Sequence, residues 1–120
     1  MINLVITARE DIKWIRGDSF DLQYAFKDNT GTAVDLTGST FIMKIIAIGD
    51  TNKTAIVSFS SGSGLTLNGS AGTVTLSKTP AQMSALTAGN YLYELQETDS
   101  NSKVKTRVRG YFEVIDDITL

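Results

Sequence analysis

The residues best equipped for chemistry in this sequence are oxygen donors. Asp50-Thr51-Asn52 and Asp99-Ser100-Asn101 place side-chain oxygens at alternate positions, as calcium-binding loops do. Neither stretch continues to the spaced acidic residues and the final bidentate glutamate that such a loop requires. Asp116 and Asp117 are adjacent, so on a strand they would point to opposite faces and could not form a catalytic pair. These residues therefore predict turns and solvated surface, with no metal site.

The composition removes most other catalytic chemistry. The 120 residues include no cysteine and no histidine. The chain therefore has no thiol nucleophile, no thiolate or imidazole metal ligand, and no Ser-His-Asp triad. We expect a protein that is not an enzyme, with no catalytic residues and no cofactor.

Charge and hydropathy exclude two further classes of partner. The chain carries 11 Lys and Arg against 13 Asp and Glu, and this net charge of −2 lacks the positive field of a nucleic-acid-binding protein. The longest strongly apolar stretch, residues 41–48, is far shorter than the ~20 residues of a membrane span. The first residues have no basic region and too short an apolar run for a signal peptide. We expect no nucleic-acid or membrane partner, and synthesis in a cytoplasm.

Strands must position whatever surface the protein uses, because alternation of apolar and polar residues dominates the sequence. It predicts strands near residues 20–27, 40–48, 57–59, 65–67, 74–76, 91–96 and 104–114. About seven or eight short strands separated by glycine- and serine-rich turns indicate an all-β, antiparallel, immunoglobulin-like β-sandwich. We expect one domain over residues 1–120, with residues 1–11 as an N-terminal arm or edge strand.

One segment departs from this alternation. Thr79 is followed by proline and, three residues after Thr79, by Gln82, which is the pattern of a helix N-cap with a capping box. Met83 and Leu86 are spaced to face one side. The pattern predicts one short helix near residues 80–86.

The last two strands suggest both a register and a structural motif. A four-residue loop at 99–102 would place Glu94 opposite Arg107 and Tyr91 opposite Gly110. The sequence Gly89-Asn90-Tyr91 is typical of the tyrosine corner of immunoglobulin-like folds, in which Tyr93 would occupy the position of the second cysteine. The alternative is an ordinary tyrosine-rich strand, because Gly-x-Tyr is common before strands.

Two apolar surfaces need cover. Residues 41–48 carry isoleucines on the face that a sandwich would leave wet, and the first residues are too apolar to remain free. Either a loop of the same chain or a neighbouring subunit covers them. The predicted interface residues are Ile42, Ile46, Ile48, Ile2, Leu4 and Ile6.

Several motifs together resemble a known family. GDSFDL at residues 17–22 leads into a strand, and DNTGTAVDLTGSTF at residues 28–41 supplies a turn and the next strand. GTVTL at 72–76, GNYLYEL at 89–95 and GYFEV at 110–114 fit the same scheme. Over about residues 12–118 the chain resembles the N-terminal domain of phage baseplate upper proteins (the BppU-like family) and related immunoglobulin-like modules of phage virions.

The resemblance implies a virion structural protein: a tail or baseplate, fibre-attachment or head-associated component that docks other virion proteins as a homo-oligomer. The protein would then be located in the virion after assembly in the host cytoplasm. In this scheme Gly31 and Gly38 serve turns, Asp35 satisfies loop backbone, and Leu36 plugs one end of the sandwich. The alternative is a carbohydrate-binding or adhesin-type β-sandwich, in which Trp14 and Tyr111 lie outside the core and stack on sugar rings.

Overall fold

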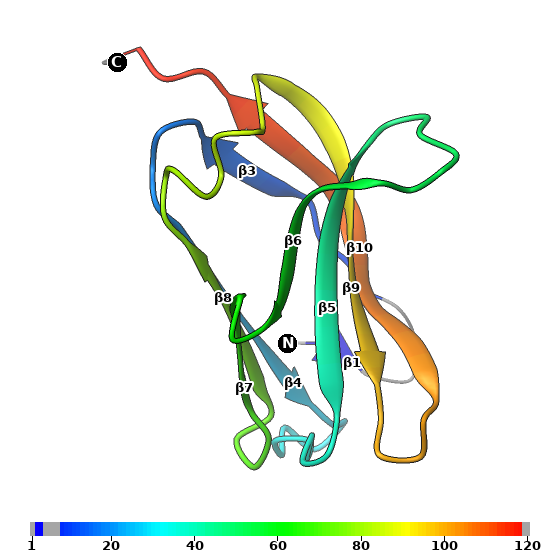
Figure 1. Cartoon of the computed structure of the whole chain (residues 1–120). Helices are drawn as coiled ribbons and strands as arrows, with labels where there is room; N and C mark the ends of the chain where they lie inside the picture. The colour runs from blue at the N-terminus through cyan, green and yellow to red at the C-terminus, as the bar shows by residue number, and fades with distance from the viewer. Residues whose placement is uncertain (1, 4–7, 119–120) are drawn as a thin grey trace.

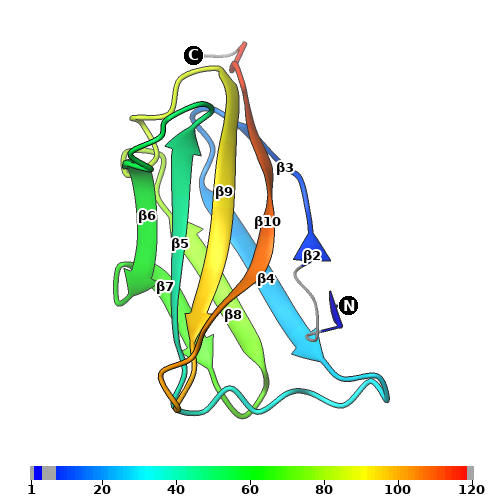
Figure 2. The same ribbon diagram turned by 90° about the vertical axis from the view of Figure 1, so that its right-hand side faces the viewer.

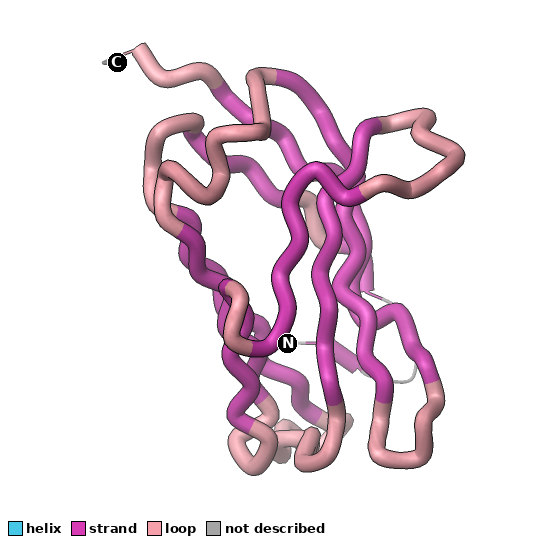
Figure 3. The backbone as a smooth tube through the Cα atoms, in the orientation of Figure 1, coloured by secondary structure: helices cyan, strands magenta, loops and turns pink. Residues whose placement is uncertain are grey.

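The computed structural model describes residues 2–3 and 8–118, and every regular element in them is a strand (Figure 3). The ten strands are β1 (Ile2–Asn3), β2 (Ala8–Arg9), β3 (Ile12–Ile15), β4 (Phe20–Lys27), β5 (Thr40–Ala47), β6 (Ala55–Ser61), β7 (Gly64–Asn68), β8 (Thr73–Lys78), β9 (Gly89–Thr98) and β10 (Val104–Ile115). The all-β class and the seven strands expected from the alternation are confirmed. No helix in the described part of the chain is long and apolar enough to cross a membrane.

The strands form one curled sheet. Hydrogen-bonded neighbours follow the order β1-β4-β8-β7-β6-β5-β9-β10-β2, and β3 also pairs with β10. The sheet folds back so that β4 and β8 lie across from β9 and β10 in Figure 1 and behind them in Figure 2. The ring centroids of Phe20 on β4 and Phe112 on β10 are 5.6 Å apart. The result is a nearly closed, barrel-like wall around one core.

Alternating side chains fill this core. On β5, Phe41, Met43 and Ile45 point inward and are at most 2% exposed. Phe41 stacks on Phe26 of β4 with ring centroids 5.9 Å apart. Leu36, which precedes β5, is also 2% exposed. Because each inward apolar side chain removes its full surface from water, the alternation fixes which face of every strand is buried.

The turn residues before β5 behave as the family resemblance implies. Asp35 Oδ1 accepts the Thr37 backbone amide at 3.0 Å and the Thr37 hydroxyl at 2.6 Å. Gly38 has φ +85°, a conformation that side chains with a Cβ rarely adopt. The turn delivers Leu36 into the end of the core.

The expected helix near residues 80–86 is absent, so that prediction is wrong. The capping box does form: Gln82 Oε1 accepts the Thr79 amide at 2.9 Å, and Thr79 Oγ1 accepts the Gln82 amide at 3.3 Å. The hydrogen bonds that follow are mainly of the i→i+3 type, from Ser84 to Ala81 and from Leu86 to Met83. These are successive turns, because the chain must reach β9 within a few residues while burying Met83 and Leu86.

The predicted β9–β10 register is also wrong. Glu94 pairs with Arg109, and Tyr91 pairs with Phe112. The connecting loop is one residue longer than expected, since Asp99 N donates to the Lys103 carbonyl and Ser102 takes φ 63°. A β-bulge between Thr106 and Val108 shifts the register once more.

The tyrosine corner is confirmed. Tyr91 at the start of β9 donates its hydroxyl hydrogen to the Thr87 carbonyl at 2.8 Å. Tyr93, two residues further on, is 2% exposed and its hydroxyl donates to the Glu10 carbonyl. This bond ties the residues between β2 and β3 to the core.

The N-terminal residues pair at the sheet margin. β1 runs parallel to β4, and β2 runs parallel to β10. Both pairings are two residues long, as for an edge strand. Leu4 and Ile6 of the predicted interface lie outside the described residues, as does the side chain of Ile2.

Candidate functional site

The outward side chains of β5, β9 and β10 form three rows across the strands. In Figure 2 these three strands lie in front of β4 and β8, so the side of the sheet away from the core faces the viewer. We name this surface the outer face. Its rows, read from β5 to β10, are Ile42–Gln96–Thr106, Lys44–Glu94–Arg109 and Ile46–Leu92–Tyr111. A charged row therefore lies directly beside an apolar row.

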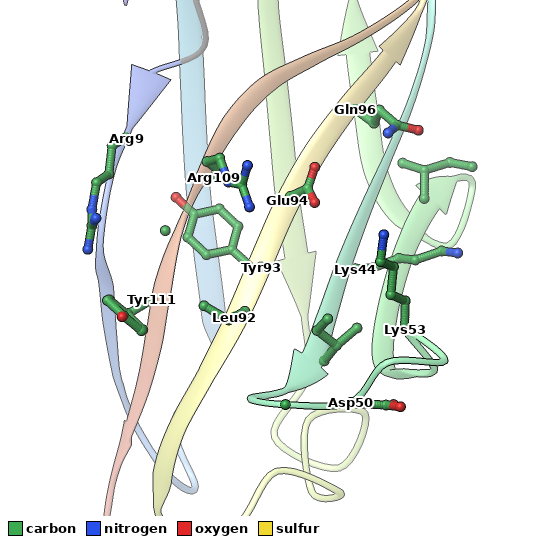
Figure 4. Close-up of a pocket in the computed structure, with 14 residues that line it drawn as sticks. Arg9, Lys44, Asp50, Lys53, Leu92, Tyr93, Glu94, Gln96, Arg109 and Tyr111 are labelled. Atoms are coloured by element: carbon green, nitrogen blue, oxygen red, sulfur yellow. The ribbon is translucent and has the colours of Figure 1, made fainter.

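A shallow groove of about 780 Å³ runs over this face (Figure 4). The loop after β5 forms one wall through Gly49, Asp50 and Lys53, and Arg9 of β2 contributes at the other. Backbone pairing of three long strands makes the floor rigid, whereas the walls come from a loop and from the short β2 strand.

The groove is cationic in an acidic chain. It is lined by Arg9, Lys44, Lys53 and Arg109 against Asp50 and Glu94, a net charge of +2. Removing these from the 11 cations and 13 carboxylates of the chain leaves 7 and 11 for the remainder, a net charge of −4. The positive groove and the negative remainder would attract one another between molecules.

Local hydrogen bonds hold the two carboxylates of the groove. Glu94 Oε1 accepts from the Thr106 hydroxyl at 3.1 Å. Asp50 accepts the backbone amides of Asn52 and Thr54 at 2.9 and 3.0 Å. Within the described residues, no ion pair joins Lys44, Lys53 or Arg109 to a carboxylate. Their charges are available to a partner.

The β10 side of the groove is organised around Tyr111. The Arg9 guanidinium lies over the Tyr111 ring at 5.1 Å from the centroid. Asp11 Oδ1 accepts the Tyr111 backbone amide at 3.0 Å and lies 3.6 Å from Arg9 Nε. One face of the exposed ring is thus already occupied by a cation of the same chain.

The predicted residues Ile42 and Ile46 of β5 contribute to this surface, and Ile48 lies in the turn that follows β5. Ile42 and Ile48 are 47% and 53% exposed, and Ile46 is half-buried. Ile42 and Ile48 remain exposed within the described chain, so they are available for a contact with another molecule.

The expectation that Trp14 lies outside the core is wrong. Trp14 is 5% exposed, and its indole Nε1 donates to the Asp18 carbonyl at 3.2 Å. The reason is the parallel pairing of β3 with β10, which places Trp14 opposite Val114 on the inward face. Tyr111 is exposed as expected, at 44%.

The two candidate oxygen-donor loops are turns, as predicted. Asp99 Oδ1 accepts the amides of Asn101 and Lys103, both at 2.9 Å, in the same way that Asp50 closes its own turn. The charged row of Lys44, Glu94 and Arg109 was not predicted from the sequence. Each residue alternates outward on its own strand, but only the true register reveals that the three form one row.

Comparison with known proteins shows similarity in fold but none in sequence family. No family model and no curated protein matches the sequence. Among solved structures, the chain is similar to the N-terminal domain of phage TP901-1 ORF48, with a TM-score of 0.60 and 11% identity over 95% of this chain and 93% of that one. The fold is therefore one that a phage protein also adopts. The chain is also similar to CopC from Methylosinus trichosporium OB3b, with 16% identity over 95% of this chain and 90% of that one, but a TM-score of 0.48 does not establish a shared fold.

Proposed function

We propose that this chain is a structural protein of a bacteriophage virion that works by docking other virion proteins. The observation that carries the proposal is the fold similarity to the N-terminal domain of phage TP901-1 ORF48 over nearly the whole of both chains. The motifs at residues 17–22 and 28–41 point independently to the BppU-like baseplate domains. The role would be in a tail or baseplate, a fibre attachment or a head-associated structure, and it requires no catalysis.

The finer description is an immunoglobulin-like sandwich module. The tyrosine corner of Tyr91 and Thr87 supports it, as does the packing of β4 against β10 through Phe20 and Phe112. Such a module presents a rigid sheet face, and the outer face is the one with exposed isoleucines and free cations. We propose that this face makes the docking contact.

Mass spectrometry of purified virions tests the role directly. The protein should be present at a stoichiometry typical of structural components, and its absence from intact particles would refute the proposal. To test the face, a phage encoding Lys44→Glu and Arg109→Glu should lose most of the incorporated protein. A phage encoding Lys27→Glu and Lys103→Glu, with the same charge change at exposed positions outside the groove, should retain it.

A carbohydrate-binding module is the second candidate, and the exposure of Tyr111 is the observation that favours it. The structure offers less support than the sequence suggested, because Trp14 is buried and Arg9 occupies one face of the Tyr111 ring. Saturable binding on a glycan array that disappears in Tyr111→Ala would favour this candidate over docking.

A further inference from the structure

The segment that follows β10 is acidic, whereas the groove carries a net positive charge. Residues 116–118 are Asp-Asp-Ile; Asp116 is exposed and Ile118 is 97% exposed. Figure 1 shows this segment leaving β10 on the opposite side of the molecule from the loop that walls the groove. Ile118 therefore does not reach the groove of its own chain.

The spacing of the segment matches the spacing of the groove. In an extended chain, residues two apart point the same way and lie about 7 Å from one another. Asp116 and Ile118 are two apart, as are Lys44 and Ile46 on β5 and Arg109 and Tyr111 on β10. A segment that runs parallel to β10 would place its carboxylate on the charged row and its isoleucine on the apolar row.

We propose that the groove of one copy binds residues 116–118 of a second copy, an inference that rests on the proposed docking role of the outer face. Asp116 pairs with the unengaged cations Arg109 and Lys44. Ile118 packs on Leu92 and Tyr111, which removes an almost fully exposed apolar side chain from water.

Charge favours this arrangement over one in which two outer faces meet. A two-fold contact would bring two grooves of net charge +2 together, and like charges placed opposite one another repel. A contact between groove and segment joins two different surfaces. It is therefore heterologous, and it builds a ring or an open chain of copies according to the rotation between them.

Sedimentation velocity on purified protein over a wide concentration series is the first test. The average mass of the wild type should rise with concentration. The groove variant Lys44→Glu/Arg109→Glu and the segment variant Asp116→Ala/Ile118→Ser should each weaken self-association at least about tenfold, the effect of losing about 1.4 kcal/mol of contact energy. The control Lys27→Glu/Lys103→Glu should behave as wild type. Circular dichroism checks that every variant is folded.

Mixing the two defective variants is the decisive test. The groove variant keeps an intact segment and the segment variant keeps an intact groove, so an equimolar mixture should form a heterodimer and nothing larger. Failure to form it, or a wild type that stays monomeric at every concentration, overturns the proposal.

These outcomes separate this inference from the proposed virion role. A monomeric protein that still enters virions through its outer face would show that the groove binds a different virion protein. A heterodimer from a protein that is absent from virions would preserve the groove contact and refute the virion role.

Discussion

Arg107 Nε lies 2.6 Å from Glu97 Oε1, and both side chains are almost fully buried. The β-bulge between Thr106 and Val108 turns Arg107 toward the inside, where it meets Glu97 of the neighbouring strand. The second carboxylate oxygen of Glu97 accepts from the Ser39 hydroxyl. One buried ion pair therefore joins β9, β10 and the turn before β5 at the end of the sheet near the last hairpin.

Glu97→Ala should destabilise the fold by about 3–5 kcal/mol, because it removes the partner carboxylate of a buried guanidinium. The exposed pair of Lys105 and Asp99, with Nζ and Oδ2 3.3 Å apart, provides the control: Lys105→Ala should cost at most about 1 kcal/mol. Urea denaturation followed by tryptophan fluorescence measures both. Equal effects of the two substitutions would contradict a structural role for the buried pair.

The hydroxyl groups of Tyr91 and Tyr93 on β9 should contribute differently to the free energy of unfolding. Tyr91→Phe loses one partly exposed hydrogen bond to Thr87 and should cost about 0.5–1.5 kcal/mol. Tyr93→Phe removes the partner of the buried Tyr24 hydroxyl, 2.8 Å away, as well as the bond to the Glu10 carbonyl, and should cost about 1–3 kcal/mol. Burial, together with the bond to Tyr24, raises the pKa of Tyr93, so its hydroxyl remains a donor. Urea midpoints that rank Tyr91→Phe as the more damaging would contradict this assignment.

Local alternation was sufficient to predict the seven longer strands, since burial on a strand follows a period of two. The register between β9 and β10 was not accessible in this way. It depends on the φ of 63° at Ser102 and on the bulge at Arg107, and the bulge is stabilised by Glu97 and Ser39. Glu97 and Ser39 are distant from Arg107 in sequence, so the sequence around Arg107 does not indicate that they are its partners.

The candidate site shows the same limit. Ile42, Ile46 and Ile48 were predicted as an interface because apolar residues on a wet face are visible in the sequence. Lys44, Glu94 and Arg109 were missed as a row because three strands must first be aligned. Trp14 was misplaced because its burial depends on pairing with Val114, 100 residues away.

Gly110 on β10 should not tolerate a side chain. A Cβ at this position would overlap the Glu10 carbonyl oxygen, where the chain passes from β2 to β3 over β10. Gly110→Ala should therefore cost about 1–3 kcal/mol through overpacking. Amide exchange should accelerate at Glu10, whose amide donates to the Arg109 carbonyl at 3.0 Å.

Gly49→Ala is the matched control for Gly110→Ala. A Cβ at Gly49 meets nothing within 4 Å, although the φ of +86° carries a backbone penalty of about 1–2 kcal/mol. Its amide exchange changes should remain within the loop after β5. Unchanged exchange at Glu10 in Gly110→Ala would show that the β2–β3 segment is not held against β10.

Acid should destabilise the protein by protonating the aspartates that accept hydrogen bonds in its turns. Hydrogen bonds from the Thr30 hydroxyl and amide hold the pKa of Asp28 below its ordinary value of 3.8, and those from Thr37 do the same for Asp35. The Lys103 amide contributes most to the lowered pKa of Asp99. A carboxylate whose pKa is lower in the folded state contributes stability that is complete above its unfolded pKa and is lost as the pH falls through the folded value. Stability should therefore stay level from neutral pH to about pH 5 and decline below about pH 4.

The triple variant Asp28→Asn, Asp35→Asn, Asp99→Asn tests this origin of the acid sensitivity. The amide Oδ1 of asparagine accepts the same backbone hydrogen bonds but does not titrate in this range. Urea midpoints measured at several pH values should therefore decline less steeply on the acid side than those of the wild type. Asp18→Asn, at an exposed position whose carboxylate accepts no hydrogen bond from the described residues, serves as the control and should retain the wild-type slope. If the triple variant loses stability as steeply as the wild type below pH 4, the acid sensitivity comes from carboxylates other than those that close these three turns.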